Sequence, residues 1–146
     1  KRVFSMIPGL ENAEFVRYGV MHRNTFLNSP KLLDASYCFR KDRRIYFAGQ
    51  MTGVEGYVES NASGFLAGLA TACEILGKDA PAFPSTTAIG ALGSYISNGT
   101  VVKFQPMNIN FGILDPLGYK VKGKREKNMK ISERALEIID RMKEEF

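Results

Sequence analysis

The sequence predicts an α/β domain. Residues 44–49, Arg-Ile-Tyr-Phe-Ala-Gly, form a continuous apolar run of the kind found in parallel strands covered on both faces. A turn punctuated by Gly53 and Gly56 follows, and then a long amphipathic stretch up to residue 76. Strand, turn and helix in this order form the repeating unit of α/β folds.

The bulk composition is that of one globular domain. The chain has 146 residues, of which 45% are hydrophobic and 24% charged. Its longest apolar stretch, residues 65–76, is too short to cross a bilayer, which takes about 20 residues. No signal-peptide pattern opens the sequence, and Lys1 begins what reads as the interior of a longer chain. We therefore expect a cytoplasmic protein with no membrane partner.

Cysteine, histidine and charge limit the function classes. Cys38 and Cys73 form no C-x-x-C pair, which disfavours a disulfide reductase, and both are expected to be inert. The single histidine, His22, leaves no multi-histidine metal site. The net charge of +5 favours polyanionic partners. Much of it gathers in a basic connector made by Lys120, Lys122, Lys124, Arg125, Lys127 and Lys130. This connector either contacts RNA phosphates or is a solvated charged face.

The first half of the chain is expected to hold strands and one long helix. Residues 14–18 alternate polar and apolar, which predicts a half-buried strand, and residues 20–26 continue it as a strand or arm. A helix is expected over residues 56–76, stopped by Gly77. Its predicted buried stripe is Val58, Ala62, Phe65, Leu66, Leu69, Ala72, Cys73 and Leu76. Gly64 and Gly68 inside it predict close approach to another element.

The second half is expected to hold two more helices. Thr86 or Thr87 caps a short helix that carries Ile89, Leu92 and Ile96 and ends near residue 98. Residues 100–119 are expected to be extended and irregular. The last helix is predicted from about residue 129 to residue 145. The expected division is residues 1–43, 44–119 and 120–146.

The turn over residues 49–56 is the strongest candidate site. A buried strand followed by a glycine-rich turn and a helix directs free backbone N–H groups and a positive helix end at one spot. Phosphates or an electron-rich ring edge suit that spot. The glycines are spaced G-x-x-x-G-x-x-G rather than G-x-G-x-x-G. Spacing alone therefore leaves open a tight connection that binds no ligand.

Three ordered segments carry a family resemblance. They are residues 17–26, continued by Asn-Ser-Pro at 28–30; residues 47–60, Phe-Ala-Gly-Gln-Met-Thr-Gly-Val-Glu-Gly-Tyr-Val-Glu-Ser; and residues 104–112, Phe-Gln-Pro-Met-Asn-Ile-Asn-Phe-Gly. Residues 86–92 fit between the last two. In these segments the chain resembles the methylenetetrahydrofolate-dependent tRNA (uracil-5-)-methyltransferases. The related flavoproteins that modify the wobble uridine share Phe-Ala-Gly-Gln but match the other segments less well.

The resemblance implies a fold and a reaction. The fold is the C-terminal part of a glutathione-reductase-like, Rossmann-type FAD domain, with residues 1–43 as a remnant of the inserted substrate-side region. The reaction moves a one-carbon unit from methylenetetrahydrofolate to carbon 5 of a T-loop uridine in tRNA, with FAD and NAD(P)H supplying electrons. The FAD glycine fingerprint and the catalytic cysteines have no counterpart in this sequence. We therefore assign no catalytic residue and expect an N-terminal remainder as partner, inactivity alone and exposed apolar surface.

The resemblance also implies site residues. The flavin-facing wall is expected to be Gly49, Gln50, Met51, Thr52, Gly53, Val54, Glu55 and Gly56. His22, Arg23 and Asn24 are expected to bind folate. For His22 the alternative is a histidine satisfied by backbone groups, and for the other two it is solvation at a strand end. A freestanding RNA-binding module is the alternative from another class, although no strand interleaves aromatic and basic residues as such modules do.

Overall fold

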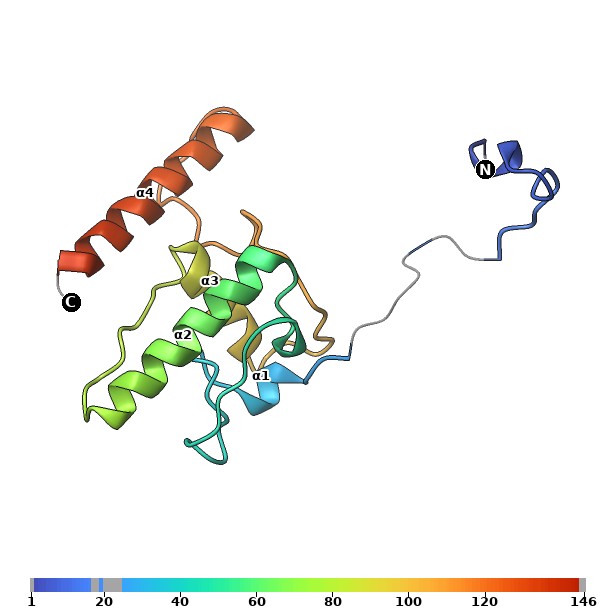
Figure 1. Ribbon diagram of the computed structural model, residues 1–146. Helices are drawn as coiled ribbons and strands as arrows, with labels where there is room; N and C mark the ends of the chain where they lie inside the picture. Colours follow the sequence, from blue (N-terminus) through green and yellow to red (C-terminus); the bar gives the residue numbers. More distant parts are fainter. Residues whose placement is uncertain (1, 17–18, 20–24, 145–146) are drawn as a thin grey trace.

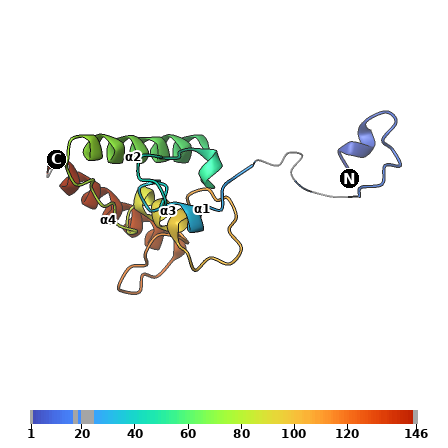
Figure 2. The ribbon, with the colours of Figure 1, turned by 90° about the horizontal axis from the view of Figure 1, so that it is seen from below.

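The structure, a computed structural model, describes residues 2–16, 19 and 25–144 and is mainly helical. Its helices in chain order are η1 (Phe4–Met6), α1 (Ser29–Leu32), η2 (Gln50–Thr52), α2 (Tyr57–Ile75), α3 (Ala88–Ser97) and α4 (Lys124–Glu144). The short α3 crosses behind the long α2 in Figure 1, and in Figure 2 it lies on the same side of α2 as α4. Within the described ranges no helix has the length and apolar character needed to cross a membrane.

The predicted strand at residues 44–49 is wrong as an element. Tyr46 makes an isolated antiparallel bridge to Cys38, and Phe47 N–H donates to the Tyr37 carbonyl at 3.0 Å. Ile45 is 41% exposed, so the expected cover on both faces is missing from this part of the chain. A buried parallel strand is covered by its neighbouring strands and crossover helices. The described residues supply isolated bridges only, so the helices of the α/β prediction are present here and its sheet is not.

Helix α2 confirms the predicted bounds and part of the predicted buried stripe. It begins after Gly56 and ends before Gly77, which has a positive φ of 63°. Leu66 and Cys73 of the predicted stripe are buried, whereas Val58 and Phe65 are 79% and 56% exposed. The full set of buried residues is Glu59, Ser63, Leu66, Ala67, Ala70 and Cys73. The helix therefore packs through mostly small side chains, because these let its backbone approach the core closely.

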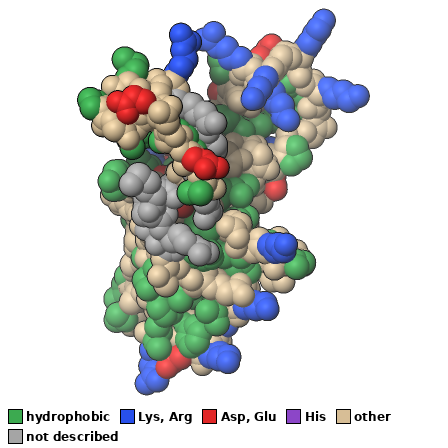
Figure 3. Space-filling view, turned by 90° about the vertical axis from the view of Figure 1, so that its right-hand side faces the viewer, with side chains coloured by type: hydrophobic (Ala, Val, Ile, Leu, Met, Phe, Trp, Pro, Cys, Tyr) green, Lys and Arg blue, Asp and Glu red, His purple; other side chains and the backbone are tan. Residues whose placement is uncertain are grey.

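Exposed apolar groups mark the other side of α2, as expected from the sequence. Leu76 is 68% exposed just beyond the helix, and apolar side chains also reach the surface on the face shown in Figure 3. Gly64 and Gly68 face open space, since a Cβ at either would meet no atom of the described chain within 4 Å. The close approach predicted at these two glycines is therefore not made by the described residues.

Helix α3 is fixed by its cap and by two glycines. The Thr87 hydroxyl accepts the Gly90 N–H at 3.2 Å, so Thr87 rather than Thr86 is the capping residue. A Cβ at Gly90 would overlap the Pro84 carbonyl, and one at Gly93 would lie 2.7 Å from the Ala35 carbonyl oxygen. The helix thus lies directly on neighbouring backbone, which only glycine permits.

Two clusters of buried residues make the core. The larger holds α2 and α3 against the loops between them and consists of Leu33, Tyr37, Val54, Leu66, Ala67, Leu92, Ile96 and Phe104. The smaller, Ala91, Leu114 and Ile131, joins α3 to α4. The second cluster is what anchors the C-terminal helix to the rest of the chain.

Helix α4 begins at Lys124, five residues earlier than about residue 129. Gly123, with φ of 97°, precedes it. Much of the expected basic connector is therefore the first turns of the helix. The helix is buried at Ile131, which is 1% exposed.

The N-terminal residues show no strand in the described part. Residues 14–16 are not in a strand, whereas residues 17, 18 and 20–24 of the two predicted strands lie outside the described residues. Phe4 and Phe15 contact each other edge to face, with ring centroids 5.4 Å apart. Nearly all of residues 2–16 are exposed.

Candidate functional site

The turn over residues 49–56 changes direction at three glycines. Gly49, Gly53 and Gly56 have φ values of 74°, 90° and 102°, which side chains of L residues rarely adopt. The short helix η2 lies between the first two, and α2 begins after the third. The glycine spacing therefore encodes the path of the backbone.

Polar side chains hold the turn from inside. The Gly49 N–H donates to Ser63 Oγ at 2.7 Å, and Thr52 Oγ1 donates to the Gly49 carbonyl at the same distance. Thr52 and Val54 are fully buried. Ser63 therefore fixes the turn to α2, and the buried side chains of Thr52 and Val54 fix it to the core.

Residues 104–112 lie along the turn and support it. The Glu55 N–H donates to the Met107 carbonyl and the Met107 N–H to the Gly53 carbonyl, both at 3.0 Å, which makes the parallel bridge of Val54 with Met107. Asn108 Nδ2 donates to the Glu55 carbonyl at 3.0 Å. Two of the three motif segments are thus brought side by side.

Two glycines of the turn have no room for a side chain. A Cβ at Gly53 would overlap the Phe104 ring, and one at Gly56 would overlap the Glu59 carboxylate. The Phe104 ring is itself packed against Tyr95, with centroids 5.4 Å apart, and against Phe26 at 6.0 Å. The turn is therefore pressed onto a supported aromatic cluster.

The outer side of the turn is open. Gln50 is exposed, Met51 is 46% exposed and Tyr57 is 98% exposed. No side chain of the described residues caps the start of α2, a helix of 19 residues. The Glu59 carboxylate lies against Gly56 at this helix start, on the buried side. The exposed side of the first turn is a candidate place for an anionic or electron-rich group.

The predicted flavin-wall residues divide into two sets. Gln50 and Met51 face outward, whereas Thr52 and Val54 point into the core and contribute structure and backbone. Gly49, Gly53, Glu55 and Gly56 supply backbone, with Glu55 and the two outer glycines partly exposed. Contact with flavin stays a prediction for the whole set.

The predicted folate residues His22, Arg23 and Asn24 lie outside the described residues. The chain that follows them is described from residue 25. There the Leu27 N–H donates to the Met51 carbonyl at 2.8 Å. The end of the first motif is therefore held at the same turn as the other two.

Both cysteines are buried, in agreement with the inert prediction. Burial raises the pKa of the Cys38 thiol above its usual range, which outweighs the opposing effect of a hydrogen bond with Tyr46. Cys38 Sγ donates to the Arg43 carbonyl at 3.5 Å. Across the described ranges, no three His, Cys, Asp or Glu residues are grouped to hold a metal ion.

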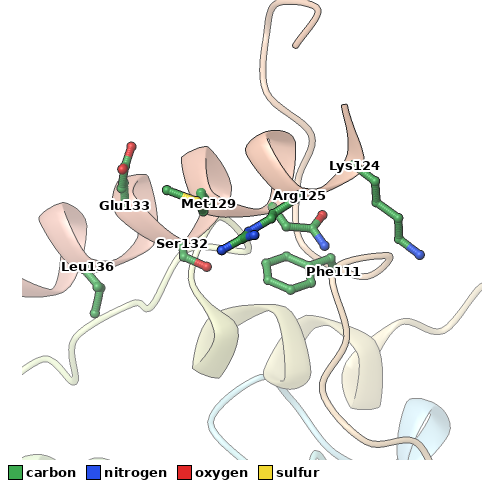
Figure 4. Close-up of a pocket in the computed structure, with 8 residues that line it drawn as sticks. Phe111, Lys124, Arg125, Met129, Ser132, Glu133 and Leu136 are labelled. Atoms are coloured by element: carbon green, nitrogen blue, oxygen red, sulfur yellow. The ribbon is translucent and has the colours of Figure 1, made fainter. Parts of the chain in front are cut away.

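A cavity lies away from the turn. It is an open groove of about 660 Å³ between Phe111 and the first turns of α4 (Figure 4). Its lining is Phe111, Lys124, Arg125, Asn128, Met129, Ser132, Glu133 and Leu136. A smaller cavity of about 320 Å³, lined by Phe26, Asn28 and residues 102–105, lies beside the turn. Sequence reasoning gave Phe111 no role, although an aromatic residue in a motif near a basic segment was a usable signal.

Curated relatives match nearly the whole chain. Methylenetetrahydrofolate–tRNA-(uracil-5-)-methyltransferase TrmFO of Acetivibrio thermocellus is 61% identical over 139 residues, which are 95% of this chain and 32% of the relative. Proteins of the same name from Ligilactobacillus salivarius and Listeria monocytogenes are 58% and 56% identical over 98% and 100% of the chain, and 33% and 34% of their own lengths. The chain thus spans about a third of the curated relatives it matches. The resemblance predicted from the three motifs is confirmed.

A family model agrees with these relatives. The model described as glucose inhibited division protein A matches residues 1–79, which include the turn and all of α2. More than half of the sequence is covered by this match. The chain therefore belongs to the glucose inhibited division protein A family.

Proposed function

We propose that this chain is part of a flavin- and folate-dependent tRNA (uracil-5-)-methyltransferase and forms one wall of its FAD site. The observation that carries the proposal is the turn over residues 49–56, which presents an uncapped helix start between glycine-lined backbone and exposed side chains. The relatives that share 54–61% of its residues bear the name of this enzyme. The complete reaction belongs to a protein about three times as long as this chain.

The turn fits an electron-rich ring or a phosphate. The first-turn N–H groups at Tyr57 and Val58 and the positive helix end would stabilise negative charge held beside them. Gly49 and Gly56 leave the backbone accessible, and Gln50 and Met51 offer side chains on the same open side. When bound, reduced FAD supplies the electrons that convert the one-carbon unit to a methyl group.

The substrates are assigned to neighbouring parts of the chain. His22, Arg23 and Asn24 would bind methylenetetrahydrofolate, and the hydrogen bond from Leu27 to Met51 supports a location next to the flavin wall. The uridine of tRNA and NAD(P)H complete the set of reactants. The Rossmann-type fold belongs to the same proposal, in which residues 44–49 pair with strands from the rest of the enzyme.

The division of the chain also belongs to the proposal. Residues 44–119 are tied together by the pairing of Val54 with Met107, which supports one FAD-domain unit. Residues 1–43 would be the substrate-side remnant. Residues 120–146 would form the basic connector and the C-terminal helix, and the presence of α4 within them supports this boundary.

A chimera tests the proposal. This chain replaces the matching third of the Acetivibrio thermocellus relative, with which it is 61% identical. The measurements are FAD content by visible absorption and 5-methyluridine formed in an unmodified tRNA transcript with methylenetetrahydrofolate and NAD(P)H. We expect bound FAD and methylated tRNA. A folded chimera that binds FAD but forms no 5-methyluridine would exclude this reaction.

A matched pair of glycine variants tests the flavin wall itself. Gly56→Ala in the chimera should lose FAD, because a Cβ there displaces the Glu59 carboxylate and distorts the start of α2. Gly118→Ala, at a glycine where a Cβ would meet no atom of the described chain within 4 Å, is the control for a Gly→Ala change. Equal FAD content in both variants would remove the turn from the cofactor site.

A further inference from the structure

The first turns of α4 carry positive charge where a helix does not favour it. Lys124, Arg125 and Lys127 stand at the helix start, with Glu126 the acidic residue of the first turn. The helix dipole is positive at this end, so cations there lower helix stability. No carboxylate of the described residues forms an ion pair with these three cations. Residues that lower the stability of their own element are often found at binding sites. Because the residues here are cations, the site would be one for an anion.

An apolar groove lies directly beside these cations. Phe111, Met129 and Leu136 are 45%, 53% and 65% exposed and line the cavity of about 660 Å³. Figure 4 shows the Phe111 ring below the first turns of α4, with the Arg125 side chain extending toward it and Lys124 at one end. We call this cavity the Phe111 groove. Its volume lies within the range of ligand sites.

The groove is a fixed part of the fold. Ile131 is 1% exposed and packs in the second core cluster. Arg134 Nη1 donates to the Pro116 carbonyl at 2.9 Å, and its other terminal nitrogen donates to the Asp115 carbonyl. Both residues hold α4 from the side that faces the core. The groove-lining side of the helix is therefore presented without depending on a ligand.

We propose that the Phe111 groove binds an unpaired nucleotide of RNA. The base would stack on the Phe111 ring, while Lys124 and Arg125 would contact the adjoining phosphates. Exposed aromatic rings beside cations are the combination that single-stranded nucleic acid uses, because every base has a face that stacks. The proposal rests on the proposed function, in which the RNA is a tRNA.

The alternative occupant is an acidic protein segment. Such a segment would pair with Lys124 and Arg125 but has no need of an exposed ring. Glu133 also lines the groove, in an ion pair with Lys130 at 3.4 Å, and would repel carboxylates and phosphates alike. The exposed Phe111 ring, on which a base can stack, is therefore what favours RNA.

Binding of the chain to a short uridine-rich single-stranded RNA, followed by fluorescence anisotropy over a range of salt, tests the groove. Lys124→Gln/Arg125→Gln should lower the slope of log affinity against log salt by roughly 1.4, because about 0.7 is lost for each phosphate contact on a single strand. Phe111→Leu should weaken binding roughly tenfold and leave the slope unchanged, because it removes stacking and no charge.

Matched variants control for charge and for apolar area elsewhere. Lys41→Gln/Lys78→Gln removes two exposed cations, and Phe65→Leu changes a ring that is 56% exposed on α2. Phe65→Leu should leave RNA affinity unchanged. Lys41→Gln/Lys78→Gln should lower RNA affinity only by the general effect of two lost positive charges. Circular dichroism melting confirms that all variants are folded. Groove variants that bind as tightly as the wild type, or a wild-type chain without RNA affinity, would overturn the proposal.

Two further outcomes identify other occupants or other sites. Competition by polyglutamate as effective as that by RNA would assign the groove to an acidic protein and overturn the proposal. Photocrosslinking with 5-iodouridine RNA should attach to Phe111, and attachment only to the turn at residues 49–56 would also overturn it. Crosslinking at Phe111 in a chimera that forms no 5-methyluridine would retain the groove while the methyltransferase function fails. If the chimera forms 5-methyluridine and the groove variants do not change its RNA binding, the methyltransferase function stands and the groove proposal fails.

Discussion

Glu59 Oε1 accepts the backbone N–H of Ile109 at 3.1 Å, and this bond joins the first turn of α2 to the segment at residues 104–112. Glu59 is only 9% exposed, although it is an acid at the start of a helix. Its carboxylate also lies against Gly56, in the space that a Cβ would fill. One side chain therefore connects the glycine turn, the long helix and the last motif segment.

Removal of this carboxylate should destabilise the chain. Glu59→Ala leaves the Ile109 N–H without its partner, and a buried unsatisfied group costs about 1–3 kcal/mol in the free energy of unfolding. Glu59→Gln keeps an acceptor oxygen and should recover most of that loss. Urea unfolding measures both. Glu137→Ala on the exposed side of α4 is the control, and a loss there as large as in Glu59→Ala would show that the bond contributes nothing particular.

Gly53→Ala and Gly64→Ala should have effects of opposite sign. At Gly53 the φ of 90° and the Phe104 ring both oppose a Cβ, so we expect a loss of more than about 1 kcal/mol in the free energy of unfolding. At Gly64 the Cβ enters open space within a helix, where alanine is favoured by up to about 1 kcal/mol. The melting temperatures of the two variants measure this difference. Equal shifts of melting temperature in the same direction would contradict the prediction of opposite signs.

The same Gly64 variant reports on what covers α2 in a longer protein. The sequence predicts close approach of another element at Gly64. If another part of the enzyme packs against Gly64 in the chimera, Gly64→Ala should destabilise the chimera, although it stabilises this chain alone. The comparison uses the two melting temperatures. Stabilisation in both contexts would show that this side of α2 faces solvent throughout.

Local signals in the sequence predicted the helices well. The bounds of α2 follow from Gly56 and Gly77, since glycine readily adopts the positive φ values found there. The sequence limits the N-cap residue of α3 to Thr86 or Thr87. The start of α4 at Lys124 is not predicted from the sequence. Lys124 and Arg125 are cations at the positive end of the helix dipole, where acidic residues are the usual signal of a helix start. Functional sites are where such local rules are expected to fail.

Pairing and burial were harder to predict, because they depend on partners. Residues 44–49 have the composition of a covered strand, but Ile45 is 41% exposed when only this third of the relatives' length is present. The predicted buried side of α2 is correct at Leu66 and Cys73 but wrong at Phe65, which is apolar yet exposed. The approach of residues 104–112 to the turn depends on long-range hydrogen bonds, which no periodicity encodes. Only the family resemblance connected the two segments.

Thr87 and Thr86 offer a matched test of capping. Thr87→Val removes the oxygen that accepts the Gly90 N–H and should cost about 1 kcal/mol in the free energy of unfolding. Thr86→Val should be neutral or stabilising, because the buried Thr86 hydroxyl has no hydrogen-bond partner among the described residues. Thr87→Ser should retain the cap. Equal losses in the two valine variants would contradict the assignment of Thr87.

Stability should fall at alkaline pH because of Tyr37. Burial raises the pKa of this phenol above its ordinary value of 10.0, so the folded protein keeps the proton where the unfolded chain releases it. The contribution of Tyr37 to stability is therefore fully present below pH 10.0 and is lost as pH rises through the raised pKa of the folded state. Cys38 and Tyr46, whose pKa values burial also raises, act in the same direction.

Tyr37→Phe isolates this effect because it removes the ionisable oxygen and keeps the buried ring. Urea unfolding of wild type and variant between about pH 8 and about pH 11 measures the free energy of unfolding at each pH. The wild type should lose more stability over this range than Tyr37→Phe. Tyr119→Phe, at a tyrosine that is 61% exposed, should follow the wild type. Parallel pH profiles for wild type and Tyr37→Phe would show that Tyr37 does not titrate with unfolding.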